Sequence, residues 1–150
     1  MFKKIVKQDY DVVAKLMMRA FRNSPWNEDW DFKRAYQRVE QLNDGNYARC
    51  YAYFLDDKIV GVVCGRLLTY VDDLELRIED FYVDPDYQRM GIGKKMMTLL
   101  IEELCDVDIF SLVTGKDFYS VDFYQKNSFE KNEDVTYMCR RRGLKDAKSV

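Results

Sequence analysis

The sequence contains no histidine, and this absence excludes several kinds of catalytic centre. Without an imidazole there is no Ser-His-Asp or Cys-His nucleophile and no His-ligated metal site. The four cysteines, Cys50, Cys64, Cys105 and Cys139, lie far apart and form no CxxC pair. We therefore expect buried, reduced thiols and no bound metal. Any chemistry must use carboxylates, tyrosines, lysines or backbone amides.

Long apolar runs and a strong charge of one sign are also missing. The longest apolar runs, such as 59–64, are far too short to span a membrane, and no signal peptide precedes the first strand-like segment. Lys and Arg number 24 against 26 Asp and Glu, a net charge of -2 that gives no overall attraction to nucleic acid. With 150 residues and no linker or repeat, we expect one cytoplasmic domain over 1–142 and a tail over 143–150.

The hydrophobic periodicity predicts a mixed α+β fold. Val13, Leu16, Met17, Ala20 and Phe21 have the spacing of an amphipathic helix, and a second such helix is expected over 32–42. Strands are expected over 2–6, 47–55, 58–70, 74–83, 109–114 and 135–141, with helices from 91 and over 120–126. This order gives an antiparallel meander that continues into a β-α-β unit, a mixed central sheet flanked by helices.

The most informative segment connects the strand over 74–83 to the following helix. The strand ends before Pro85, and the helix begins on the glycine pair Gly91 and Gly93. Free N–H groups and the positive end of the helix dipole make such a start a suitable anion site, and glycine lets a diphosphate approach the backbone closely. Arg89 and Lys94 add positive charge. The segment therefore predicts a phosphate-binding loop.

The spacing distinguishes this loop from two common phosphate motifs. A Walker A loop needs glycine where Gln88 stands, and a dinucleotide fingerprint needs a third glycine where Met96 stands. What remains is Gln-x-x-Gly-x-Gly after a strand, which is a weak signal alone. It is followed by Asp117, Ser120 and the run from Phe123 to Phe129.

Together these residues resemble the GCN5-related N-acetyltransferase (GNAT) superfamily over 75–140. The family pattern is Q/R-x-x-G-x-G/A followed by F-Y-x-K-x-G-F, and this chain departs from it at Ser128, which replaces a glycine, and at Asp117, which replaces a frequent asparagine. The resemblance implies the GNAT fold and acetyl-CoA as acyl donor. The run 78–83 is particularly similar to spermidine/spermine acetyltransferases. The run 83–89 resembles ribosomal-protein N-terminal acetyltransferases, which carry a glutamate base where this chain has Leu112.

The resemblance also implies roles for individual residues. The backbone of the strand would pair with the pantetheine arm, and the loop amides would hold the pyrophosphate. Tyr124 would protonate the departing thiolate. The implied cofactor-binding set is Phe81, Tyr82, Val83, Gln88, Arg89, Met90, Gly91, Ile92, Gly93, Lys94, Asp117, Ser120 and Tyr124.

An amine acceptor needs a base, because a protonated amine cannot attack. Strand alternation predicts Glu79 on the same face as Phe81, with Ile78, Asp80 and Tyr82 on the other. The resemblance places Glu79 like the strand carboxylates that serve as base in some family members, whereas Asp80 is expected to be a structural hydrogen-bond acceptor. The alternatives are that Glu79 is a substrate anchor or a rim carboxylate, and that Tyr124 is a core tyrosine.

The loop over 26–31 is the candidate acceptor site. Trp26, Glu28 and Trp30 could attract a cationic amine through charge and cation–π contact, or the loop could merely cap a helix. We expect acetylation of a small cationic amine, polyamine- or aminoglycoside-like. The alternatives are acetylation of a peptide N-terminus or lysine, and a CoA-binding sensor or partner without turnover. The resemblance leaves a homodimer open.

Overall fold

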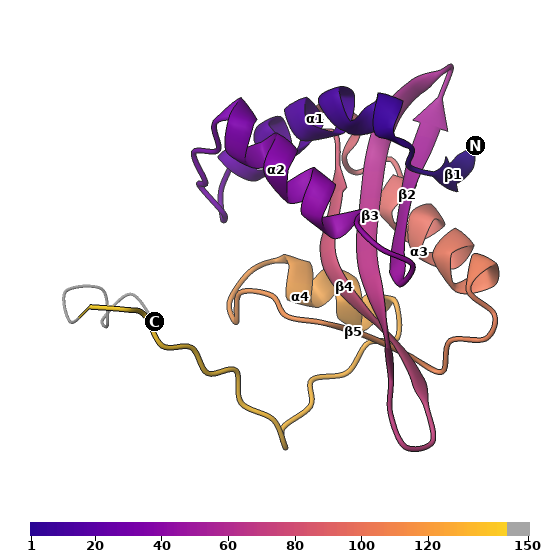
Figure 1. Ribbon diagram of the computed structural model, residues 1–150, viewed down its shortest axis with the longest axis vertical. Helices are drawn as coiled ribbons and strands as arrows, with labels where there is room; N and C mark the ends of the chain where they lie inside the picture. The colour runs from indigo at the N-terminus through magenta and orange to yellow at the C-terminus, as the bar shows by residue number, and fades with distance from the viewer. Residues whose placement is uncertain (144–150) are drawn as a thin grey trace.

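A computed structural model describes residues 1–143 as one mixed sheet with helices on both faces (Figure 1). The strand order is β1-β2-β3-β4-β5, in which β1 to β4 are antiparallel and β5 is parallel to β4. This confirms the predicted α+β class. The elements are β1 (Phe2–Lys4), α1 (Tyr10–Arg22), α2 (Phe32–Leu42), β2 (Ala48–Leu55), β3 (Lys58–Thr69), β4 (Leu74–Val83), α3 (Ile92–Glu103), β5 (Ile109–Leu112) and α4 (Ser120–Lys126), with 3₁₀ turns at Lys7–Asp9 and Pro85–Tyr87.

Local sequence signals set most of these boundaries. Asp31 begins α2, because its Oδ1 accepts a hydrogen bond of 2.8 Å from the Arg34 N–H. Asp56 and Asp57 join β2 to β3 in the left-handed conformation, with φ of 48° and 65°, as a tight hairpin requires. No helix among residues 1–143 has the length and apolar character needed to cross a membrane.

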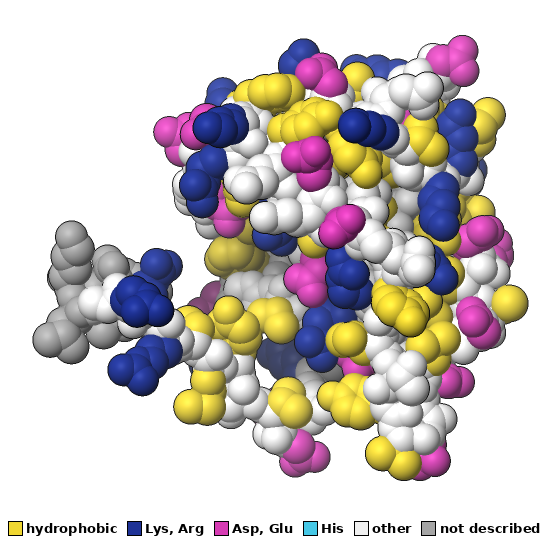
Figure 2. All heavy atoms as spheres, in the orientation of Figure 1, with side chains coloured by type: hydrophobic (Ala, Val, Ile, Leu, Met, Phe, Trp, Pro, Cys, Tyr) yellow, Lys and Arg dark blue, Asp and Glu magenta, His cyan; other side chains and the backbone are white. Residues whose placement is uncertain are grey.

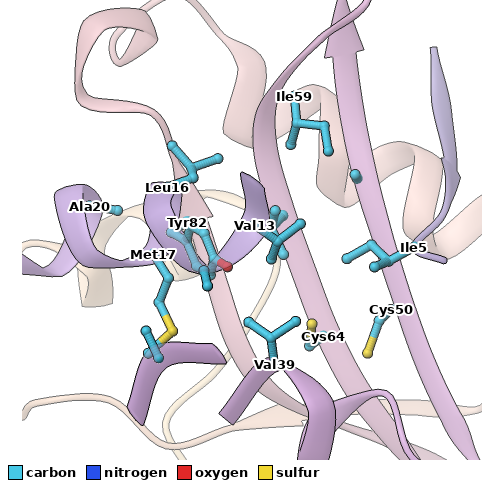
Figure 3. Packing of buried hydrophobic residues seen from close by; sticks show 14 residues of the cluster. Ile5, Val13, Leu16, Met17, Ala20, Val39, Cys50, Ile59, Cys64 and Tyr82 are labelled. Carbon is cyan, nitrogen blue, oxygen red and sulfur yellow. The ribbon is translucent and has the colours of Figure 1, made fainter. Parts of the chain in front are cut away.

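The core has two layers, one on each face of the sheet. On one face α1 and α2 cover β2, β3 and β4, and Figure 3 shows Val13, Met17 and Val39 directed toward Cys64 and Tyr82. On the other face the buried side of α3 packs against the sheet. That layer consists of Met96, Met97 and Leu100 on Val60, Val63, Leu76 and Ile78, among others. Burial of these apolar side chains holds the helices on the sheet.

The cysteine prediction is confirmed for two of the four residues. Cys50 and Cys64 are buried cross-strand partners in β2 and β3. Cys105 and Cys139 are exposed instead. Cys105 lies just beyond α3, and Cys139 lies in a segment that does not join the sheet, so neither reaches the core.

An extra residue in β4 changes which side chains share a face. Ile78 pairs with Gly65 and Asp80 pairs with Cys64, so Glu79 has no partner in β3 and forms a β-bulge. As a result Ile78 and Phe81 lie on the α3 face, while Tyr82 packs on the α1 face. The predicted alternation is therefore wrong in placing Ile78 on the face of Asp80 and Tyr82, whereas those two residues do share the face covered by α1 and α2.

The strand predicted over 135–141 is also wrong. Residues 130–143 are exposed and lie in no strand or helix. The sequence of this segment does place apolar side chains at alternate positions. A strand forms, however, only when a neighbouring strand accepts and donates its backbone hydrogen bonds. In the structure this segment runs away from the sheet (Figure 1). Apart from Gly143, the predicted tail 143–150 lies outside the described residues.

Candidate active site

The separation of β4 and β5 creates a groove. β5 pairs with β4 only from Glu75 to Ile78, opposite Ile109 to Leu112, and beyond this point the two strands diverge. Within the described residues, Asp80 to Val83 therefore have a strand neighbour on the β3 side alone. The resulting groove has a volume of about 1490 Å³ and reaches from the α1–α2 loop to the start of α3. Figure 2 shows this face hollowed between the α1–α2 layer and the segment after α4.

A buried carboxylate fixes the loop that follows β4. Asp84 is fully buried and accepts two hydrogen bonds from the Arg19 guanidinium, at 2.8 and 3.1 Å, and one from the Asp86 N–H at 2.9 Å. Burial alone would raise the pKa of Asp84, but the Arg19 and backbone hydrogen bonds outweigh it and hold that pKa below its usual range. The loop is thereby attached to α1.

The same loop then turns into α3 through left-handed residues. Arg89 has φ of 63° and Gly91 has φ of 78°, and Gly91 is the N-cap of the helix. The Lys95 N–H makes the first i→i−4 bond, to the Gly91 carbonyl at 3.1 Å, so the amides of Ile92 to Lys94 lack a helical acceptor. Ile92, Gly93 and Lys94 line the groove, together with Arg89. The start of α3 is suited to bind an anion.

The two glycines serve different purposes. Gly91 meets nothing within 4 Å of an added Cβ, so its left-handed φ is the reason for glycine. At Gly93 an added Cβ would lie 3.1 Å from Cε1 of Phe123, so close packing of α4 is the reason. Both glycines line the groove.

Tyr124 lies in the groove wall on α4, opposite β4. Its ring packs edge-on against Phe81, Phe123 and Phe129, at centroid distances of 6.2, 5.2 and 5.4 Å. Burial raises the pKa of Tyr124 far above that of a free phenol, with a smaller effect from the Asp80 charge. The phenol therefore keeps its proton over the whole physiological range.

A cluster of charged and aromatic groups lies at the other end of the groove. Arg38 on α2 makes a bidentate pair with Asp80, at 3.0 and 2.8 Å, which confirms the structural role predicted for this aspartate. Burial nevertheless raises the pKa of Asp80, partly offset by the Arg38 hydrogen bond. The Trp30 indole N–H donates to the Glu28 carboxylate at 2.8 Å. Glu79 also lines this end and is exposed.

Trp26 connects two loops across the groove. Its ring lies 5.5 Å from Phe21 of α1, and 5.9 and 5.5 Å from Phe118 and Tyr119 in the loop before α4, all edge-on. Trp26 is thus an aromatic bridge between the two halves of the chain rather than a free lid. The sequence gives no signal for Phe118 and Tyr119, because their role depends on a contact across the fold.

The structure brings most of the predicted site residues to this one groove. Met90 and Asp117 are exceptions, since both are exposed and neither lines it. Ser120 is buried beside Thr114, with 2.8 Å between the hydroxyl oxygens. The groove-lining residues from the predicted set are Trp26, Glu28, Trp30, Glu79, Phe81, Tyr82, Val83, Gln88, Arg89, Gly91, Ile92, Gly93, Lys94, Ser120 and Tyr124.

The roles of Arg38 and Ser128 cannot be predicted from the spacing of the sequence motifs. Arg38 lines the groove and fixes Asp80, but nothing in its helix pattern marks it. Ser128 has φ of 70°, so the turn after α4 does require the conformation that glycine adopts most easily. The Gln88 side chain, in turn, donates to the Val83 carbonyl at 3.2 Å.

Comparison with known proteins bears on the family and the fold. The model of the Acetyltransferase (GNAT) family matches residues 12–129. GCN5-related N-acetyltransferase 2, chloroplastic, of Arabidopsis thaliana is 39% identical over 57 residues, which are 38% of this chain and only 22% of that protein. Spermine/spermidine N(1)-acetyltransferase of Bacillus subtilis strain 168 is 22% identical over 107 residues, which are 66% of this chain and 70% of that protein.

A solved structure shows the same fold. The crystal structure of a possible acetyltransferase from Clostridium difficile 630 superposes with a TM-score of 0.82. Its sequence is 17% identical, and the match covers 95% of this chain and 98% of the other.

Proposed function

The chain belongs to the GNAT acetyltransferase family, and from this premise we propose that it acetylates a primary amine of a small, multiply charged cation such as a polyamine. One observation carries the proposal. A single groove joins the anion-binding start of α3 to a wall that carries Glu28 and Glu79, with Tyr124 also in its wall. The name of the Bacillus subtilis relative, a spermine/spermidine acetyltransferase, supports the same class of acceptor.

The groove has the features that acetyl-CoA needs. Its volume exceeds the roughly 300–1,000 Å³ of typical small-molecule sites, as suits a long ligand. The unpaired edge of β4 from Phe81 to Val83 would pair with the amide groups of the pantetheine arm. The free amides of Ile92 to Lys94, together with Arg89, would hold the pyrophosphate.

Two side chains of this chain would handle the protons. When bound, acetyl-CoA supplies a thioester that an amine can attack directly. The Glu79 carboxylate would take a proton from the ammonium group of the acceptor, directly or through water, so that the nitrogen lone pair becomes free. The Tyr124 hydroxyl would give its proton to the departing sulfur, and its raised pKa ensures that the proton is present.

The charge of the acceptor end supports a cationic substrate. Arg38 neutralises Asp80, whereas Glu28 and Glu79 form no ion pair among the described residues. Their negative charge would attract an ammonium group and keep an anionic one away. Trp30 adds aromatic surface at this end, and one cation, the Arg38 guanidinium, already lies over its ring with Cζ 6.0 Å from the centroid.

The first experiment measures CoA release with a thiol reagent. Acetyl-CoA is offered with spermidine, spermine, an aminoglycoside, free lysine or short peptides, and reactions without acceptor correct for the exposed Cys105 and Cys139. We expect turnover on the small cations and a KM that rises with salt, because screening weakens attraction between exposed charges. Turnover on peptides alone would move the function to protein acetylation. Binding of acetyl-CoA without turnover on any amine would favour a sensor.

Three charge-removing variants test the roles of the acceptor wall. Glu79→Gln should lower kcat/KM at least about tenfold, roughly 1.4 kcal/mol of transition-state stabilisation. Glu28→Gln should raise KM with a smaller effect on kcat. Asp72→Asn is the matched control, because this exposed carboxylate lies in the β3–β4 turn and does not line the groove. If Asp72→Asn changes KM as much as Glu28→Gln, the effect is one of net charge and the acceptor assignment fails.

A further inference from the structure

The loop between β4 and α3, residues 84–91, is held to the rest of the fold through Asp84. The Asp84 N–H donates to the Val60 carbonyl of β3 at 2.7 Å, and the Asp84 carbonyl accepts from the Tyr87 N–H at 2.8 Å. The Asp84 carboxylate also accepts from the Asp86 N–H at 2.9 Å. Asp84 therefore fixes both the attachment of the loop to the sheet and its first turn.

Two cations lie near the buried Asp84 carboxylate, and they are not equivalent. Arg19 of α1 donates from Nη1 at 3.1 Å and from Nη2 at 2.8 Å to the two different carboxylate oxygens. Lys58, at the start of β3, has its Nζ 3.7 Å from Oδ2, and its side chain is half exposed. A guanidinium fork fixes the orientation of a carboxylate as well as its position, whereas an ammonium group acts as a point charge. Arg19 is therefore the group that orients the Asp84 side chain.

The part of the loop that lines the groove lies beyond this attachment. Gln88, Arg89 and Gly91 line the groove, whereas Arg19 and Asp84 do not. Arg89 has φ of 63°, and a residue with a side chain keeps such a conformation only when the surrounding structure holds it there. The shape of the loop at the start of α3 therefore depends on how firmly the earlier residues are held.

We infer that Arg19 is a positioning residue for the acyl donor, although it lies on α1 and does not line the groove. By orienting Asp84, Arg19 holds the loop in the conformation in which the amides of Ile92 to Lys94 bind the pyrophosphate. This role rests on the proposed function, in which the start of α3 is the pyrophosphate site. Arg19 acts on donor affinity and not on the chemical step, because Glu79 and Tyr124 lie outside the loop that it holds.

Calorimetric titration with CoA measures the donor site without any amine acceptor. Arg19→Lys keeps the charge and loses the fork, whereas Arg19→Gln loses both. The Kd for CoA should rise by about threefold in Arg19→Lys and by about tenfold or more in Arg19→Gln. In the acetylation assay the KM for acetyl-CoA should rise in the same order, while kcat at saturating acetyl-CoA stays within about twofold of the wild type.

A matched control and a local measurement separate positioning from charge and from stability. Arg22→Gln makes the same change of charge on the same helix, at an exposed residue that forms no ion pair within residues 1–143, and it should leave the Kd for CoA unchanged. Amide hydrogen exchange should become faster over 84–94 in both Arg19 variants and stay unchanged in α2 and β3. Urea unfolding shows which variants are folded at the assay temperature, and Arg19→Lys decides the test if Arg19→Gln is not.

The possible failures point to different errors. A wild type that does not bind CoA would overturn the proposed donor site, and the role of Arg19 with it. Folded Arg19 variants that bind CoA as tightly as the wild type would overturn the positioning role alone. A lowered kcat with an unchanged KM for acetyl-CoA would do the same. An equal loss of affinity in Arg22→Gln would mean that only the net charge of α1 matters.

Discussion

Asp84→Asn should destabilise the protein although the change is nearly isosteric. The carboxylate is fully buried and accepts two hydrogen bonds from Arg19 and one from the Asp86 N–H. An amide retains one acceptor oxygen and turns its NH₂ group toward a guanidinium that also donates. Hydrogen bonds to charged groups are worth about 1.5–3 kcal/mol each, and the Arg19 side chain is 47% exposed, so solvent offsets part of the loss. We expect a loss of about 2–3 kcal/mol in the free energy of unfolding.

The pH dependence of this loss identifies its cause. The pKa of Asp84 lies below its usual range in the folded protein, so the charged form contributes stability above the ordinary Asp pKa of about 3.9. That contribution declines as the pH falls below this value and is lost as the pH falls through the lowered pKa of the folded state. The difference between the wild type and Asp84→Asn should therefore be constant near neutral pH and shrink in acid.

Urea unfolding at several pH values measures both quantities, and Asp86→Asn is the matched control. Asp86 pairs with the same Arg19 at 3.2 Å, but its side chain is 76% exposed, so its removal should cost about 0.5 kcal/mol or less. Equal effects of the two substitutions at pH 7 would refute the reasoning that burial determines the strength of the pair. So would an Asp84→Asn deficit that persists unchanged at pH 3.

Substitutions at four further positions test separate parts of the fold and site. Tyr124→Phe should lower kcat at least about tenfold, while acetyl-CoA should still raise the melting temperature of the variant. The kcat of the wild type should show no loss from tyrosine ionisation up to about pH 9, because the pKa of Tyr124 is raised. Ser128→Gly should stabilise the protein by about 0.5–1 kcal/mol in urea unfolding, since φ is 70°, whereas Ser128→Ala should give no gain. Gly93→Ala should lower the free energy of unfolding by about 1–2 kcal/mol and raise the KM for acetyl-CoA, because the new methyl group meets Phe123 at 3.1 Å. An unchanged KM would mean that Gly93 does not contribute to acetyl-CoA binding. Asp31→Ala should cost about 1 kcal/mol through loss of the α2 cap, and an unaltered melting temperature would contradict that role.

Local patterns were sufficient to predict most of the elements. The helical spacing of Val13, Leu16, Met17 and Ala20 corresponds to the buried side of α1, and α4 begins and ends where the sequence predicts. These features depend on residues close in sequence, for which periodicity and capping are direct physical signals.

What the sequence could not reveal depends on distant contacts. The Arg19–Asp84 pair joins residues 65 positions apart, and Trp26 joins the α1–α2 loop to the loop before α4 across the groove. The apolar alternation over 135–141 predicts a strand, but whether that strand forms depends on a neighbour that the segment does not encode. The identity of the amine acceptor could not be predicted from the sequence either, because acceptor binding depends on charges that three separate elements place along one wall of the groove.

The bulge at Glu79 shifts the side-chain alternation of β4 by one position. One supernumerary residue changes the side of the sheet on which every later side chain of the strand lies, so that Tyr82 enters the α1 layer and Phe81 faces α4. A deletion at this position would thus not merely remove a carboxylate. It would exchange the two faces from Asp80 to Val83, separating Asp80 from Arg38 and Phe81 from Tyr124 in one step. The length of this strand, and not only its composition, is therefore part of what specifies the site.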